Sequence, residues 1–302
     1  MKGTLQSKTK QTLIIGVKSN IMAILRLFGL YFMMTFLMVI VGLVVGAYFG
    51  GDPFSGMFVF LFIALAINIF SYFYSDTLVL KAYGAQIIER QDSPRLYGMV
   101  KNIANINELP MPRIAIVESS TPNAFATGRN PKNAVVAATT GLMSILDDNE
   151  LEGVMAHEMA HVKNRDTLVM CVAATIAGAI AFAARILWWN SLFGRGRNVH
   201  PALMLLVILT APLAAFLLQM AVSRSREFHA DATAAKLTNK SWALVSALKK
   251  LEWENHRKPL DCGSPSNAAL CIVNPLRGGD FFINMFSTHP PMEDRIKALE
   301  KL

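Results

Sequence analysis

The chain has 302 residues, of which 53% are hydrophobic and 17% charged, and Lys plus Arg exceed Asp plus Glu by eight. Soluble domains average about 25% charged residues, so this composition excludes disordered, collagen-like and coiled-coil proteins and argues against a simple soluble protein. With so much apolar sequence, the basic surplus fits the inner face of an anionic bilayer better than nucleic acid, and we expect no nucleic-acid partner.

The first long apolar stretches lie near the N-terminus. Residues 27–51 carry no charged side chain, nor do residues 54–75, and Asp52 and Pro53 form a turn between them. A helix needs roughly 20 apolar residues to cross a bilayer, so residues 27–75 are predicted to form a transmembrane hairpin; the alternative is a hairpin buried in a large soluble core. Five Lys and Arg residues precede it, which places residues 1–26 in the cytoplasm by the positive-inside rule.

Two further apolar stretches, residues 168–184 and 201–223, are also uncharged. They predict a second transmembrane hairpin at 168–223, the third span being the less secure of the four. Residues 76–167 and 224–302 would then both be cytoplasmic. Arg195 and Arg197, in the loop between these spans, oppose the positive-inside rule. A second hairpin that enters the membrane without crossing it is therefore the alternative.

The segment 76–167 has the pattern of an ordinary soluble module. Ser93 followed by Pro94 is typical of a helix start, and short runs rich in β-branched residues are typical of strands. The predicted elements are, in chain order, a helix at 96–106, strands at 113–117 and 133–138 with extended residues 123–128 between them, and a helix opening at 147–150. Residues 291–302 are predicted to close the chain as a helix.

The sequence His157-Glu158-Met159-Ala160-His161 is an H-E-x-x-H motif on the helix that opens at 147–150. Histidines four residues apart project from one face of a helix, so both imidazoles can bind one Zn²⁺. The metal would lower the pKa of a bound water to about 7, and Glu158 could take its proton. The motif therefore predicts a zinc hydrolase site.

A zinc site of this kind needs a third protein ligand, and the segment directly after residue 223 offers candidates. Glu227 is the preferred ligand, and Asp231, one helical turn on, can orient a liganding histidine through its far nitrogen. His229 is the alternative ligand, although it lies about 160° around the helix from Glu227. If both ligand-bearing helices run continuously into the membrane, the zinc lies within roughly 10 Å of the apolar boundary.

Three motifs together resemble the HtpX-type membrane metalloproteases, relatives of the CAAX prenyl endopeptidases. They are the H-E-x-x-H before an apolar span, the segment Arg226-Glu227-Phe228-His229-Ala230-Asp231, and Thr288-His289-Pro290-Pro291. The N-terminal hairpin and the segment Asn123 to Gly128 look similar too, so the resemblance covers nearly the whole chain.

The resemblance implies a gluzincin with one Zn²⁺ per chain, metal ligands His157, His161 and Glu227, and Glu158 as the general base. It also implies degradation of misfolded or damaged inner-membrane proteins under stress. The residues Asn123, Ala124 and Phe125 look like the edge strand that pairs with substrate in that family.

Two further residues are candidates for the chemistry. His289 is a candidate donor to the oxyanion of the tetrahedral intermediate, or else a surface turn residue. Arg295, near the start of the last helix, is a candidate to orient His289 or a carboxylate ligand, or else forms a surface salt bridge.

We therefore expect a mainly α membrane protein, with four transmembrane helices and a cytoplasmic α+β zincin domain that contains a small sheet. It would sit in the cytoplasmic membrane and cleave membrane proteins or unfolded polypeptides. A catalytically inactive zinc-binding membrane adaptor is the main alternative. A metal transporter is the other, but its ligands should lie within the spans, and here they lie outside them.

Overall fold

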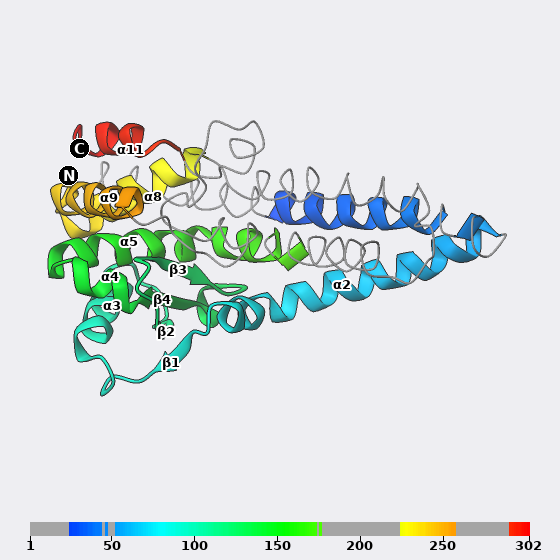
Figure 1. Ribbon diagram of the computed structural model, residues 1–302, viewed down its shortest axis with the longest axis horizontal. Helices are drawn as coiled ribbons and strands as arrows, with labels where there is room; N and C mark the ends of the chain where they lie inside the picture. Colours follow the sequence, from blue (N-terminus) through cyan, green and yellow to red (C-terminus); the bar gives the residue numbers. More distant parts are fainter. Residues whose placement is uncertain (1–23, 44–45, 48–51, 174, 177–223, 258–289) are drawn as a thin grey trace, which may run out of the picture.

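The computed structural model describes residues 24–43, 46–47, 52–173, 175–176, 224–257 and 290–302. Within these residues, the helix Ile24–Leu43 and helix α2, Pro53–Ala82, are long and apolar enough to cross a bilayer. They lie side by side and extend away from the rest of the molecule (Figure 1). The predicted second hairpin at 168–223 lies almost wholly outside the described residues, and so does His289.

The surface of these two helices is strongly apolar. Phe32 and Phe62 have 73% and 69% of their surface exposed, and many other large apolar side chains on the pair are exposed as well. Soluble proteins rarely expose apolar patches of this size. The first predicted hairpin is thus present as two helices, and its exposed surface suits a lipid environment.

Helix α2 begins as the sequence predicts but ends later. Asp52 caps it, since its carboxylate accepts hydrogen bonds from the backbone N–H groups of Phe54 and Ser55 at 3.0 Å. The helix continues past residue 75 to Ala82, so the predicted boundary between hairpin and soluble segment falls inside it. Asp76 pairs with Arg113 at 3.3 Å and thereby joins α2 to the sheet.

The soluble part combines a mixed four-stranded sheet with several helices. The sheet order is β1-β2-β4-β3, in which β2 and β4 are parallel and the two outer pairs antiparallel. The strands are β1 Gln86–Ile88, β2 Arg113–Val117, β3 Ala124–Thr127 and β4 Val135–Thr139. The helices are α3 Pro94–Ile106, α4 Thr140–Ile145, α5 Asp148–Asn164, α8 Arg224–Thr238, α9 Ser241–Arg257 and α11 Met292–Leu299.

Alternate residues of the strands enter two different cores, because successive side chains of a strand point to opposite faces. On one face, Ile114 and Val136 pack with α3, α5, α8, α9 and α11. On the other face, Ala115, Val135 and Phe125 pack with the helix Ile24–Leu43, with α2 and with residues 169–173 and 176. The sheet therefore separates a core formed with α3, α5, α8, α9 and α11 from a core shared with the two long apolar helices.

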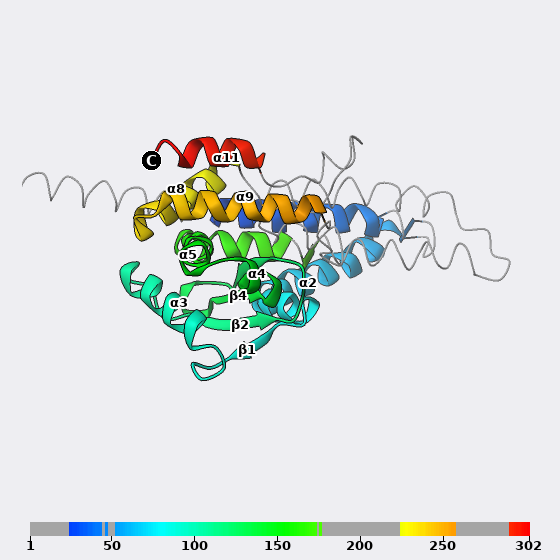
Figure 2. The same cartoon turned by 60° about the vertical axis from the view of Figure 1, so that its left-hand side comes forward.

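Helix α5 lies at the centre of the first core. In both views it lies between the sheet and the pair α8 and α9, with α11 outermost (Figures 1 and 2). Twelve of its residues are buried, from Glu150 to Val162. A helix covered on nearly all sides can hold polar side chains away from water, provided that they have partners.

Candidate metal centre

The start of α5 is fixed by its own sequence. Asp147 accepts hydrogen bonds from the N–H groups of Asn149 and Glu150, and the Glu150 carboxylate accepts one from the N–H of Asp147 at 2.9 Å. This capping box satisfies N–H groups that would otherwise lack partners. The predicted helix start is therefore confirmed, and it sets the register in which the H-E-x-x-H residues face inward.

The end of α5 differs from the expectation of a helix that runs on unbroken. Arg165 adopts a left-handed conformation with φ 59°, and the backbone becomes helical again only from Asp166. Few residues other than glycine adopt this conformation, and it reorients the chain between the metal-binding helix and the segment at 166–173. The condition of a helix that runs unbroken from His161 into the apolar stretch is therefore not met at Arg165.

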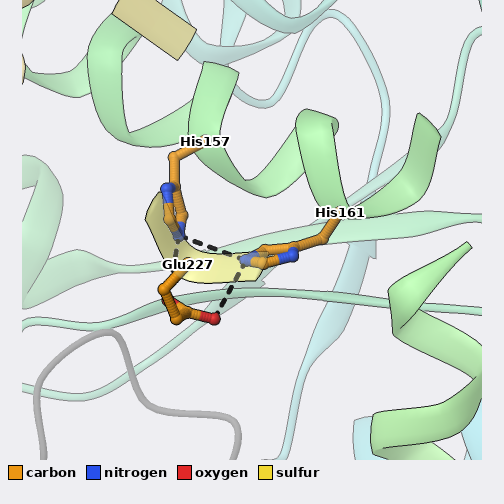
Figure 3. Close-up of side chains that lie close together, drawn as sticks. All are labelled: His157, His161 and Glu227. Carbon is orange, nitrogen blue, oxygen red and sulfur yellow. Dashed lines mark hydrogen bonds and ion pairs between the residues drawn. The ribbon is translucent and has the colours of Figure 1, made fainter. Parts of the chain in front are cut away.

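Three predicted ligands meet between α5 and α8. The Nε2 atoms of His157 and His161 are 3.2 Å apart, and Glu227 places its Oε2 3.6 Å from the former and its Oε1 3.5 Å from the latter. All three side chains are buried. Figure 3 shows both imidazoles reaching from α5 towards the Glu227 carboxylate. Within the described residues, this is the group of His, Cys, Asp or Glu side chains arranged to hold a metal ion.

The spacing of these atoms fits zinc. A zinc ion about 2.0–2.1 Å from each donor in a tetrahedron separates neighbouring donors by about 3.3–3.4 Å. The three observed separations of 3.2, 3.6 and 3.5 Å are close to that value. Two imidazoles and one carboxylate are one of the donor sets found in catalytic zinc sites, in which water takes the fourth position.

The far nitrogen of His157 faces a charged pair. Its Nδ1 lies 2.8 Å from Oδ1 of Asp231. Arg295 in turn donates two hydrogen bonds to Asp231, from Nε at 2.8 Å and from Nη2 at 2.7 Å. Arg295 is fully buried, and its Nη1 also lies 4.0 Å from Oε2 of Glu227, so its pair with Asp231 is not a surface salt bridge. Of the two roles considered for Arg295, the structure places it on a carboxylate within the site.

Electrostatics in the metal-free protein follow from this pair. Burial by itself would lower the pKa of His157, but the charge and hydrogen bond of Asp231, together with Glu227, raise that pKa to about 10. Burial raises the pKa of Asp231, but Arg295 and His157 outweigh it and lower that pKa to about 2. Burial lowers the pKa of Arg295, but the charges of Asp231, Glu227 and Glu158 outweigh this effect and raise that pKa.

His161 has a carboxylate neighbour that the sequence analysis missed. Its Nδ1 lies 3.4 Å from Oδ2 of Asp166, and Arg226 donates from Nη1 to the other oxygen of Asp166 at 2.9 Å. Asp166 is buried. The available signal was a charged residue five positions after the second histidine and two positions before the apolar stretch.

The remaining predicted site residues differ in their placement. Glu158 is buried next to His157. His229 is exposed on α8 and lies outside the group of three ligands. Asn123 directly precedes β3, and its backbone N–H donates to Oγ1 of Thr139 at 2.9 Å.

The other two residues of the predicted substrate segment, Ala124 and Phe125, belong to β3 at one edge of the sheet. Phe125 is turned into the second core, where its ring lies 4.6 Å from that of Tyr83. The Phe125 side chain is therefore committed to packing, and its backbone is what it can offer a substrate.

A helix that carries H-E-x-x-H, a glutamate from a second helix and a small mixed sheet define a zincin-like domain. The profile of Peptidase family M48 matches residues 90–302, and the chain belongs to that family. A "Protease HtpX homolog" of Thermococcus sibiricus is 49% identical over 259 residues, which are 83% of this chain and 88% of that protein. One of Pyrococcus furiosus is 47% identical over 264 residues, or 85% and 90%.

A solved structure titled "Crystal Structure of S. mikatae Ste24p" aligns with 94% of this chain and 67% of its own, with a TM-score of 0.49 and 17% identity. The chain is thus a metalloprotease of family M48, and its two long apolar helices and its HtpX-type relatives make it a membrane protein.

Proposed function

We propose that the chain is a membrane-embedded zinc endopeptidase that cleaves misfolded or damaged membrane proteins at the cytoplasmic face. The observation that carries this proposal is the triangle of His157, His161 and Glu227, whose donor separations match one face of a zinc tetrahedron. These three residues would hold one Zn²⁺ per chain. When bound, zinc lowers the pKa of water and polarises the scissile carbonyl.

The protein's own groups perform the proton transfers. Glu158, buried beside His157, takes the proton of the attacking water and delivers it to the amine of the leaving product. Asp231 and Arg295 hold His157 in the orientation that presents Nε2 to the metal. His289 donates a hydrogen bond to the oxyanion; it lies outside the described residues.

Substrate binds along β3 as an added strand. Among the described strands, β3 lies at one edge of the sheet, where it packs against α5 and pairs with β4. An edge strand binds an extended polypeptide through main-chain hydrogen bonds, which suits unfolded chains of varied sequence. Asn123, Ala124 and Phe125 contribute backbone groups, since the Phe125 side chain is packed in the second core.

The membrane arrangement in this proposal has four spans, with residues 168–223 as the second hairpin and both termini in the cytoplasm. Charge supports the orientation, since five Lys and Arg residues precede the first span. The segments 76–167 and 224–302 must lie on one side of the membrane, because each supplies zinc ligands to the same site. Substrate would then be cut close to the membrane surface.

The test is zinc-dependent cleavage by the purified protein. The full chain is isolated in detergent with a chelator, zinc is added back, and cleavage of the chain itself or of an unfolded membrane protein is followed. Cleavage that starts with zinc and stops with chelator is the expected result. Zinc binding at one ion per chain without cleavage would favour the inactive adaptor, and zinc uptake into vesicles would favour a transporter.

A further inference from the structure

Asp166 has no role in the proposed mechanism. It is buried, it follows the left-handed residue Arg165, and it lies between His161 and Arg226. Its Oδ2 is 3.4 Å from Nδ1 of His161, and its Oδ1 accepts a hydrogen bond from Nη1 of Arg226 at 2.9 Å. A buried carboxylate needs partners of this kind, because an unpaired charge is costly in the protein interior.

The direction of the His161 ring gives this contact its meaning. The Nε2 atom faces the other two ligands, at 3.2 Å from His157 and 3.5 Å from Glu227, so Nδ1 is the nitrogen that faces Asp166. A histidine that binds zinc through Nε2 must carry its proton on Nδ1 and donate it to an acceptor, which fixes both tautomer and ring orientation. Asp166 is that acceptor.

The two histidines thus have matching supports built from different parts of the chain. His157 faces Asp231, which Arg295 holds, and His161 faces Asp166, which Arg226 holds. Arg226 directly precedes the ligand Glu227, so its ion pair with Asp166 also ties the start of α8 to the second residue after α5. The Asp166–Arg226 pair therefore helps to position two ligands, His161 on α5 and Glu227 on α8.

The segment that carries Asp166 is also fixed to the sheet. The Thr167 hydroxyl donates to the carbonyl of Gly128 at 3.0 Å, and Thr127 Oγ1 lies 3.0 Å from Sγ of Cys171. Both contacts hold the residues after Arg165 against the end of β3. The segment that carries the Asp166 carboxylate is therefore anchored to the sheet, independently of α5. This anchoring lets Asp166 fix the orientation of the His161 ring.

We propose that Asp166 is a positioning residue for His161 and that Arg226 holds Asp166 in place. This inference rests on the proposed zinc site. Loss of an acceptor of this type lowers metal affinity about 10–100-fold. Because Arg226 acts through Asp166, its replacement should lower zinc affinity only in a protein that still carries the Asp166 carboxylate.

The experiment measures zinc affinity of the purified full-length protein by competition with a chelator. Asp166→Asn should lower the affinity about 10–100-fold and change the absorption spectrum of the Co²⁺-substituted protein. As a single substitution, Arg226→Gln should weaken zinc binding. In the Asp166→Asn background it should lower the zinc affinity little further, which a double-mutant cycle measures. The matched control is Asp76→Asn, since Asp76 also pairs with an arginine, Arg113 at 3.3 Å, but away from the site.

The control should bind zinc and Co²⁺ as the wild type does. Should Asp166→Asn fail to fold, Arg226→Gln alone carries the test, since it leaves the carboxylate in place. Unchanged zinc affinity and Co²⁺ spectrum in folded variants, with a wild type that binds zinc, would overturn this inference and leave the proposed function standing. A wild type that binds no zinc would overturn both.

Discussion

Replacement of Arg295 by methionine tests the buried network most severely. Arg295 is fully buried and Asp231 is 1% exposed, and the two share hydrogen bonds at 2.8 and 2.7 Å. Arg295→Met removes these bonds and leaves a buried carboxylate whose described neighbour is the His157 imidazole at 2.8 Å. Removal of one partner of a buried ion pair costs about 3–5 kcal/mol, which for a protein of this size lowers the melting temperature by roughly 10 °C.

The assay is thermal unfolding of the detergent-solubilised protein in excess chelator, so that metal binding does not contribute. The matched control is Lys297→Met on the same helix, because Lys297 pairs with Glu293 at 3.6 Å with both side chains exposed. Exposed pairs contribute about 0–1 kcal/mol, so the control should melt within a few degrees of the wild type. Equal melting temperatures for Arg295→Met and wild type would refute the reasoning.

Three further predictions concern the ligand, pH dependence and topology. Glu227→Ala should sharply lower the zinc content after dialysis and His229→Ala should not, because Glu227 is buried beside both histidines and His229 is exposed; the reverse pattern would make His229 the ligand. Burial raises the pKa of Glu150, but hydrogen bonds from Lys250, Ser246 and the Asp147 backbone outweigh it and lower that pKa. Its stabilisation should therefore be full above the unfolded pKa of about 4.3 and be lost as pH falls through the lowered folded value. The melting temperatures of wild type and Glu150→Gln should converge in acid, and a constant gap down to pH 3 would contradict this. Ser119→Cys and Lys250→Cys, in a background without native cysteine, should resist an impermeant thiol reagent in intact cells and react after lysis; labelling of either in intact cells would contradict the cytoplasmic placement.

The metal-binding helix could be predicted because its information is local. The acidic residues at 147–150 start the helix, and the four-residue spacing of His157 and His161 puts both on one face. Asp231 was predictable for the same reason, since it follows Glu227 by one turn of α8. Its contact with His157 could not be predicted in this way, because that contact forms only when the fold brings α8 against α5.

The roles of Asp166 and Arg226 were not predicted, because they depend on the backbone conformation after α5. They do not follow from the regular spacing of residues along a helix. The left-handed Arg165 turns the chain after α5, and an arginine at this position is not a recognisable signal for that conformation. Without that turn, Asp166 would have been placed on a continuous helix, five residues and about 140° from His161. The extension of α2 to Ala82 was missed for a related reason, since absence of charge marks a membrane segment but not the end of a helix.

The central claim is hydrolysis at a zinc site with Glu158 as the base. The most direct measurement compares wild type and Glu158→Gln, both loaded with zinc, for their rate of cleavage of an unfolded membrane protein. The substitution keeps the size of the side chain and removes the proton acceptor, so zinc content and melting temperature should match the wild type while cleavage falls by at least a hundredfold. Near-normal cleavage by the zinc-loaded variant would contradict the account.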